Sequence, residues 1–245
     1  MYGARIDVPV REFAHIFLRC PDVALRDIED IVLTIRRLDH AVEAGDWAAT
    51  PCLWRRLRFL TAPLEESWRS VSAAEVEELQ IYERHEKDLR QGKGVIEGRL
   101  SRILYLKSAD INIYRRSLAC RAGQKLCPDV YKALRATDTF RELCDDVADV
   151  EEDLVRPNFN FLVLAQRLSV DPVSVVCAEF DALLGVALAT LRRLCAGGAL
   201  DAESCAVLEA AMADEEERFR ALIPEKLGWL ALAGGGRTVA SVGAA

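Results

Sequence analysis

The residues best suited to chemistry in this chain form an acidic segment, CDDVADVEEDL, at positions 144–154. Six of its eleven residues are carboxylic acids and none is basic. At roughly 100° per residue on an α-helix, all of these acids except Glu151 share one face about 120° wide. The acids on this face are Asp145, Asp146, Asp149, Glu152 and Asp153. Stacked acids repel one another, so this row predicts a site for divalent cations such as Mg²⁺, which prefer carboxylate oxygens.

A weaker acidic row lies earlier in the chain, in RRLDHAVEAGD at positions 36–46; we call it the first acidic row and the row at 145–153 the second acidic row. Asp39, Glu43 and Asp46 stand at i, i+4 and i+7, which places them on one helical face with Arg36 alongside. One acidic row rarely holds several metal ions, so we expect this segment to supply the opposite side of the site. Taken alone, the segment is more typical of an ordinary solvated face, and it gains weight from its combination with the other row.

The elements that must position these rows are helices. Apolar residues recur at helical spacing with Gly, Pro and capping residues between the runs. The predicted helical segments are 22–46, 48–71, 72–92, 99–123, 128–155, 171–198 and 201–233. No segment favours a strand. We expect one all-α domain over residues 1–233, folded as an antiparallel helical bundle around a single core, and a disordered tail at 234–245.

Composition narrows the classes of function. A formal net charge of −7 argues against nucleic-acid binding, which needs a basic face. The eight cysteines include no CxxC pair, and there is no signal-peptide pattern, so we expect reduced thiols in a cytoplasmic protein. No apolar run reaches the roughly 20 residues that span a bilayer, so we expect no stable membrane insertion. A homodimer remains open.

The two acidic segments together resemble a known family. RRLDHAVEAG resembles the first aspartate-rich motif of squalene and phytoene synthases, in which paired arginines precede Asp-x-x-x-Asp. DVEED at 149–153 resembles their second motif, Asp-x-x-Glu-Asp, and Asp149 follows Asp39 by 110 positions, as in that layout. Asp145, Asp146 and Asp149 also fit the DDxxD motif of the wider superfamily. The helical pattern agrees with the class I isoprenoid synthase fold, in which two acidic helices face each other across a central apolar cavity.

The resemblance implies a function and a set of site residues. It implies a cluster of Mg²⁺ ions, with Mn²⁺ as an alternative, that binds the diphosphate of a C10, C15 or C20 prenyl substrate. The implied metal ligands are Asp39, Glu43, Asp145, Asp146, Asp149, Glu152 and Asp153. Asp39, Asp149 and Arg36 would be catalytic. The implied substrate contacts are Arg36, Lys107, Arg115, Arg116 and Asn160, with Asn158 beside the last. The expected enzyme is a terpene synthase that ionises one prenyl diphosphate, releases pyrophosphate and cyclises the carbocation.

Three alternatives stay open. Head-to-head coupling of two prenyl diphosphates fits the style of the motifs, although the chain is short for two substrates. A non-catalytic helical homologue fits the altered first motif, where Glu43 stands for the second aspartate. A ferritin-like di-iron bundle would need two Glu-x-x-His motifs, and the chain offers one, Glu12 to His15.

Overall fold

All regular secondary structure in the described part of the chain is helical, which confirms the all-α prediction. The computed structural model describes residues 13–14, 16–18, 28–68, 71–91, 100–124, 127–155, 159–168 and 171–234. Its helices are α2 (Glu29–Glu43), α3 (Thr50–Trp68), α4 (Val71–Arg90), α5 (Leu100–Lys107), α6 (Ala109–Arg121), α7 (Pro128–Ala148), α8 (Val150–Val155), α9 (Phe161–Leu168), α10 (Pro172–Ala196) and α11 (Ala202–Gly234). The predicted tail beyond residue 234, Asn158 and the Glu12–His15 pair lie outside these ranges.

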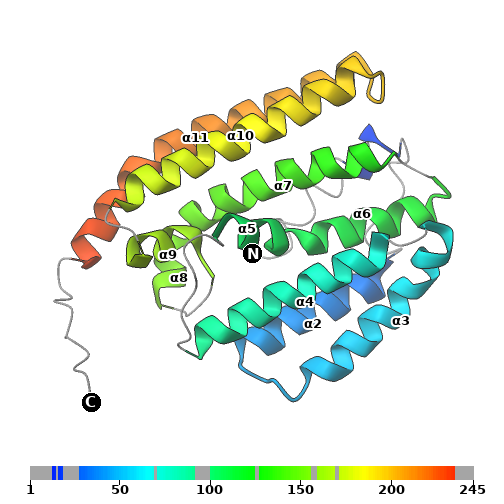
Figure 1. Ribbon diagram of the computed structural model, residues 1–245, viewed down its shortest axis with the longest axis horizontal. Coiled ribbons are helices and arrows are strands. Elements are labelled where there is room, and N and C mark those ends of the chain that lie inside the picture. The colour runs from blue at the N-terminus through cyan, green and yellow to red at the C-terminus, as the bar shows by residue number, and fades with distance from the viewer. Residues whose placement is uncertain are drawn as a thin grey trace.

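The helices lie in layers, with α5, α6 and α7 in the middle (Figure 1). The α10–α11 hairpin packs on one side of α7, and α2, α3 and α4 pack together on the other side of α6. Helices α5 and α6 follow each other directly and are interrupted only at Ser108. Almost every residue of α6 is buried, so this helix forms the centre of the bundle.

Capping residues fix the ends of the site-bearing helices. Pro128 stands in the first turn of α7, where a missing backbone N–H costs nothing. Asp171 caps α10, because its side chain accepts a hydrogen bond from the Ser174 backbone N–H at 3.1 Å. Gly45, just after α2, has a φ of 70°, a left-handed conformation that favours glycine and lets the chain turn toward α3.

The buried apolar residues form two clusters rather than the single core that we expected. One cluster joins α2, α3, α4 and α6 to the N-terminal half of α7. The other joins α5 and the C-terminal half of α7 to α9, α10 and α11. Between them lies a layer of buried polar and charged residues from α6 and α7, among them Arg115, Arg135 and Asp138. The centre of the described bundle therefore carries charge.

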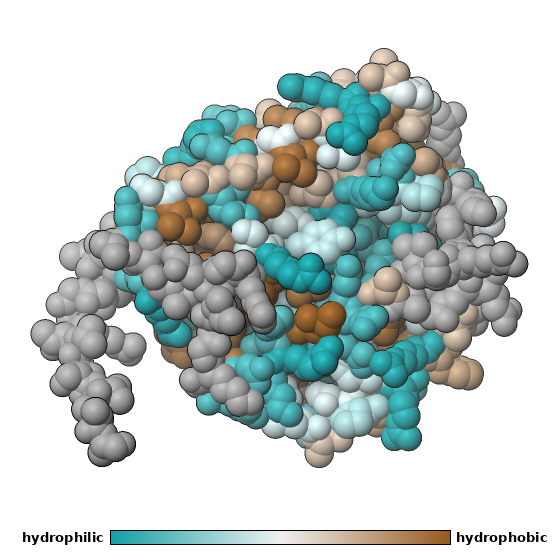
Figure 2. Space-filling view, in the orientation of Figure 1, coloured by the Kyte–Doolittle hydropathy of each residue, from teal (hydrophilic) through white to brown (hydrophobic). Residues whose placement is uncertain are grey.

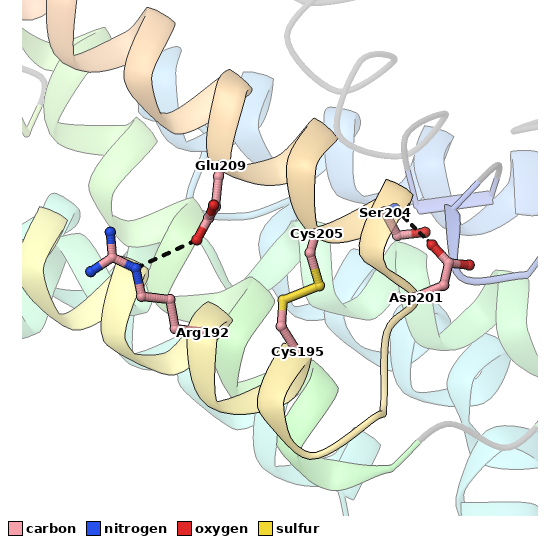
Figure 3. The surroundings of a disulfide bond; sticks show 6 residues. All are labelled: Arg192, Cys195, Asp201, Ser204, Cys205 and Glu209. Carbon is pink, nitrogen blue, oxygen red and sulfur yellow. Dashed lines mark hydrogen bonds and ion pairs between the residues drawn. A yellow bond between two sulfur atoms is a disulfide. The ribbon is translucent and has the colours of Figure 1, made fainter.

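The cysteine prediction is wrong for one pair. Cys195 at the end of α10 and Cys205 at the start of α11 form a disulfide (Figure 3). The turn between the two antiparallel helices brings their Cα atoms to 6.1 Å, within the usual range for a bridge. The spacing of ten residues between the two cysteines did not predict a disulfide, because the pairing depends on where the chain turns between α10 and α11.

The expectation of no stable membrane insertion stays a prediction, although one apolar run is longer than we expected. Residues Val173–Ala196 form one described helix that is long and apolar enough to cross a bilayer by length and composition. Core helices of soluble proteins pass the same test, so this finding is weak evidence for a span. We overlooked the run because charged residues interrupt it near both ends.

Candidate functional site

The first acidic row faces other carboxylates inside the bundle. Burial raises the pKa of Asp39 well above its ordinary value, and four neighbouring carboxylates raise it further. In decreasing order of effect they are Asp110, Glu86, Glu83 and Glu43. We call these four residues and Asp39 the inner acidic cluster. It is built from α2, α4 and α6, and none of its members belongs to the second row.

Glu83 is the member of the inner acidic cluster with the most unusual environment. Its Oε2 accepts a hydrogen bond from the Trp54 Nε1–H at 2.7 Å, while its Oε1 is buried without a hydrogen-bond partner. Burial raises the pKa of Glu83 to about 8, with a smaller contribution from Glu86 and against the hydrogen bond from Trp54. At neutral pH this carboxyl group is therefore mostly protonated.

A pocket of about 330 Å³ opens beside this carboxyl group, between α4 and the start of α3. It is lined by Trp47, Thr50, Trp54, Gln80, Glu83, Arg84 and Lys87. The Lys87 ammonium lies 4.9 Å from the centre of the Trp47 ring, a cation–π contact. Glu83 belongs to both the pocket wall and the inner acidic cluster, so the pocket leads from the surface toward the cluster.

Two basic residues reach the inner acidic cluster. Arg90 Nη2 lies 3.4 Å from Glu86 Oε1, and Arg90 Nη1 donates to the Glu43 backbone carbonyl at 3.0 Å. Burial raises the pKa of Glu86, while Arg90 and Lys107 lower it. The positive charge of these two residues therefore partly offsets the effect of burial on Glu86. Arg36, on the same helix as Asp39, is half-buried, and its Nε has no hydrogen-bond partner.

The second acidic row is not one continuous face. Helix α7 ends at Ala148 and α8 begins at Val150, so the row bends at Asp149, which is exposed. Asp146 is buried, whereas Glu152 is exposed and Asp145 and Asp153 are partly buried. This corrects the predicted geometry. Glu151, the one acid of the segment that we predicted to lie off the shared face, forms an ion pair with Lys226 of α11 at 2.8 Å.

Asp146 turns into the protein and finds a base there. Its Oδ1 lies 2.5 Å from Lys107 Nζ, and its Oδ2 accepts a hydrogen bond from the Phe161 backbone N–H at 2.7 Å. Burial raises the pKa of Asp146 to about 6, against the lowering effect of Lys107. Lys107 also lies 3.2 Å from Glu142 Oε2. Because it also acts on Glu86, Lys107 links Asp146 to the inner acidic cluster.

Asn160 holds the second row to α9. Its Nδ2 donates to the Asp146 backbone carbonyl at 2.6 Å and to Asp153 Oδ2 at 2.9 Å. Its Oδ1 accepts hydrogen bonds from the backbone N–H groups of Leu162 and Val163, so it caps the first turn of α9. The structure therefore gives Asn160 an ordering role. Whether it also contacts a substrate stays a prediction.

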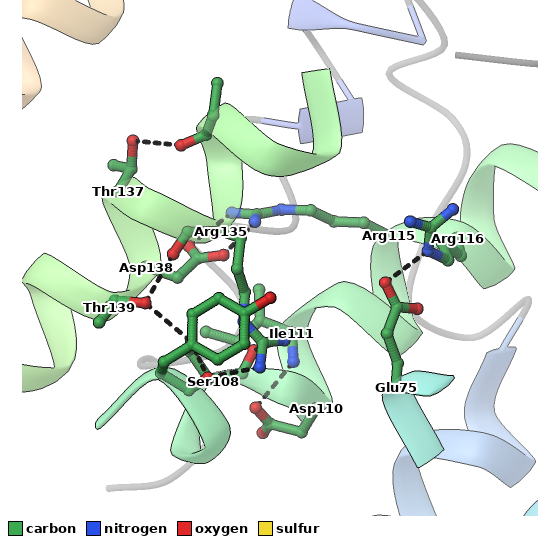
Figure 4. Close-up of polar contacts among 12 residues, drawn as sticks. Glu75, Ser108, Asp110, Ile111, Arg115, Arg116, Arg135, Thr137, Asp138 and Thr139 are labelled. Atoms are coloured by element: carbon green, nitrogen blue, oxygen red, sulfur yellow. Dashed lines mark hydrogen bonds and ion pairs between the residues drawn. The ribbon is translucent and has the colours of Figure 1, made fainter. Parts of the chain in front are cut away.

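Arg115 and Arg116 lie deeper in the core, within the layer between the apolar clusters (Figure 4). Both terminal nitrogens of Arg115 bond to the carboxylate of Asp138, one of them at 2.9 Å. Arg116 Nε lies 2.6 Å from Glu75 Oε1, and its guanidinium stacks 3.8 Å from the centre of the Tyr131 ring. Both guanidinium groups thus already have anionic partners, and their predicted contact with a diphosphate remains untested.

The described residues contain no group of three His, Cys, Asp or Glu side chains arranged around one point to hold a metal ion. The inner acidic cluster nevertheless suits a hard divalent cation chemically. Its other carboxylates raise the pKa of Asp39, and the buried Glu83 Oε1 has no hydrogen-bond partner. A bound cation would stabilise the ionised carboxylates and reverse these shifts. The cluster supplies charge at one place, but no preformed coordination shell.

Sequence reasoning missed Glu83, Glu86 and Asp110. A signal for the first two was present in α4. The apolar line begun by Val76 and Leu79 continues at heptad spacing through Glu83, Glu86 and Arg90, which places charged residues at core positions. Polar residues on the buried face of a helix point to a buried charged site. Asp110 gave no signal, because an acid in a first helical turn is common.

Comparisons with known proteins leave the family of the chain unassigned. No protein-family model, no curated protein and no solved structure matches it. The functional argument therefore depends on the residues and their arrangement.

Proposed function

We propose that the inner acidic cluster binds divalent cations together with the diphosphate of a prenyl substrate, and that the protein is a class I terpene synthase. The observation that supports this best is the raised pKa of Asp39 among four other carboxylates. Four of the five acids are partly buried, and Glu43 is exposed. Placing so many acids near each other is unfavourable unless a cation or protons stabilise them. Asp39 and Glu43 would hold the cations from α2, with Glu86 and Asp110 opposite them. The class I isoprenoid synthase arrangement of the helices is part of the same proposal.

The roles of this chain's residues follow from their positions. Bound Mg²⁺ would neutralise the charge that develops on the departing diphosphate. Arg36 and Lys107 would act as fixed cations at the edge of the cluster, because Arg36 lies on α2 with Asp39, and Lys107, at the end of α5, acts on Glu86. The indole rings of Trp47 and Trp54 would shield the prenyl chain from water in the adjoining pocket.

The test measures pyrophosphate release from C10, C15 and C20 prenyl diphosphates with and without Mg²⁺, followed by analysis of the hydrocarbon products. We expect Mg²⁺-dependent release and a cyclic or rearranged product from at least one substrate. A product containing two prenyl units would instead identify head-to-head coupling. Substrate binding without release would identify a non-catalytic homologue. Neither binding nor release with any substrate would refute the proposal.

Two matched substitutions locate the site. Asp39→Asn should lower turnover about 10²- to 10³-fold, the usual effect of losing one electrostatic group from an active site. Glu151→Gln removes an acid from the segment of the second acidic row, outside its predicted face, and should leave turnover unchanged. A full-activity Asp39→Asn variant would place the chemistry elsewhere. Circular dichroism of both variants checks that the fold is retained.

A further inference from the structure

Helix α10 is apolar but largely uncovered. In its most apolar window, only 22% of the residues are buried. Figure 2 shows tan and brown side chains over the outer side of this helix. Val186 in its middle is 56% exposed. An apolar surface of this length is costly to leave in water, which indicates that another surface covers it.

The exposed residues of α10 beyond its first turn lie on one face. At roughly 100° per residue, all the exposed residues except Val173 fall within an arc of about 140° centred between Gly185 and Ala182. The apolar members are Ala178, Ala182, Gly185, Val186 and Ala189. A Cβ atom built on Gly185 would meet nothing within 4 Å, so none of the residues that the structure describes fills the space above it. We call these five residues the α10 face.

Charges at the two ends of the α10 face have opposite signs. Glu179 and Asp181 lie toward its N-terminal end, and Arg192 and Arg193 lie toward its C-terminal end. Asp181 and Arg192 have exposed partners within the protein, Arg220 at 3.2 Å and Glu209 at 3.4 Å. Glu179 and Arg193 make no ion pair with a described residue.

We propose that the α10 face binds a second copy of this chain, with the two α10 helices antiparallel about a two-fold axis between Gly185 and Val186. The charges favour a second copy, because the acids of one α10 face lie opposite the arginines of another only when the two helices run in opposite directions. The axis places residue 193 within about 1.5 Å, measured along the helix, of residue 179 of the second copy. It places residue 192 within about 3 Å of residue 181 of the second copy.

The angular positions agree with this pairing. A two-fold axis perpendicular to both helices keeps each residue on the same side of the interface in both copies. Glu179 and Arg193 lie on one side of the α10 face, at about 90° and 50° from its centre. Asp181 and Arg192 lie on the opposite side, at about 70° and 50°. Each arginine of one copy therefore meets an acid of the other. The small residues between them let the helices approach closely.

A membrane fits the face less well. Asp181 lies within the exposed arc, in the N-terminal half of the apolar run, where a lipid would remove the water around its ion pair with Arg220. A second copy supplies an arginine at the same position.

The experiment measures the mass of the full chain in solution by light scattering over a range of concentrations. The expected species has twice the chain mass of 27.2 kDa. Gly185→Leu should yield a monomer, because the added side chain fits the isolated protein but separates the two helices. Its melting temperature at low protein concentration should not fall, since leucine favours a helix more than glycine does.

A charge exchange identifies the partner surface. Arg193→Glu and Glu179→Arg should each raise the dissociation constant at least tenfold, and the double variant should restore it, because both ion pairs re-form with reversed signs. Lys132→Glu on α7 changes the net charge as Arg193→Glu does and should have no effect. A wild-type monomer would overturn the proposal, whether or not it binds vesicles of neutral lipid. A dimer insensitive to both Gly185→Leu and Arg193→Glu would overturn it too.

Discussion

The buried pair of Arg115 and Asp138 offers the clearest stability prediction. The Asp138 side chain has no exposed surface and that of Arg115 is 2% exposed. The two groups pair through both guanidinium nitrogens, and the Arg115 guanidinium lies 5.9 Å from the centre of the Phe13 ring. Asp138→Ala leaves a buried cation without its anion, in a place that water does not reach.

The expected loss is large. Removing one partner of a buried ion pair costs about 3–5 kcal/mol of unfolding free energy. In a domain of this size each kcal/mol lowers the melting temperature by about 2–4 °C, so the fall should be about 6–20 °C. Replacing both residues, as in Arg115→Met with Asp138→Leu, should cost much less, because no unpaired charge remains.

Thermal denaturation followed by circular dichroism measures both effects. A loss below about 1 kcal/mol for Asp138→Ala would refute the reasoning, since it would mean that water or another group reaches Arg115. The double variant also tests the predicted role of Arg115 in substrate binding. If it folds and retains the turnover of the wild type, Arg115 does not contact the diphosphate.

Two further predictions concern the second acidic row. Burial raises the pKa of Asp146 to about 6, so the stability from its protonation is full below about pH 4 and is lost as pH rises through 6. Asp146→Asn should remove this pH dependence of the unfolding free energy, which is worth at most about 3 kcal/mol. Urea unfolding at pH 4.5 and pH 7.5 measures it. An equal change in unfolding free energy between the two pH values in both proteins would contradict the prediction. Asn160→Ala should cost about 2–4 kcal/mol in the same assay, because it loses the α9 cap and leaves the Asp146 carbonyl unpaired. A loss no greater than that of the partly exposed Gln166→Ala would show that water replaces these bonds.

The helices could be predicted because their signals are local. The apolar spacing of α2 lies within one segment, and Pro128 and Asp171 mark helix starts that the structure reproduces. The two-cluster core could not be predicted in the same way. It depends on the ion pair between Arg115 and Asp138, which are 23 positions apart in the sequence. Because of this pair, charged residues on the inner sides of α6 and α7 are buried rather than exposed at the surface.

The second acidic row shows why spacing alone gave a wrong geometry. Val147 and Val150 fit one continuous helix, and the row contains no base. The missing base is Lys107, which lies 39 positions earlier and pairs with Asp146. The Phe161 backbone N–H adds a second bond to the same carboxylate. These distant partners draw Asp146 inside, and the chain bends at Asp149 after it.

This difference changes which row is the better candidate for binding cations. Asp146 already has Lys107 and Asn160 nearby, and Asp149 is exposed to water, which screens its charge. In the inner acidic cluster, burial and the neighbouring carboxylates raise the pKa of Asp39, while Arg90 and Lys107 lower only the pKa of Glu86. A cation gains most where the charge is least compensated and water is excluded. We therefore expect Asp39→Asn to impair Mg²⁺-dependent turnover more than Asp149→Asn, the reverse of the order that motif strength alone suggests.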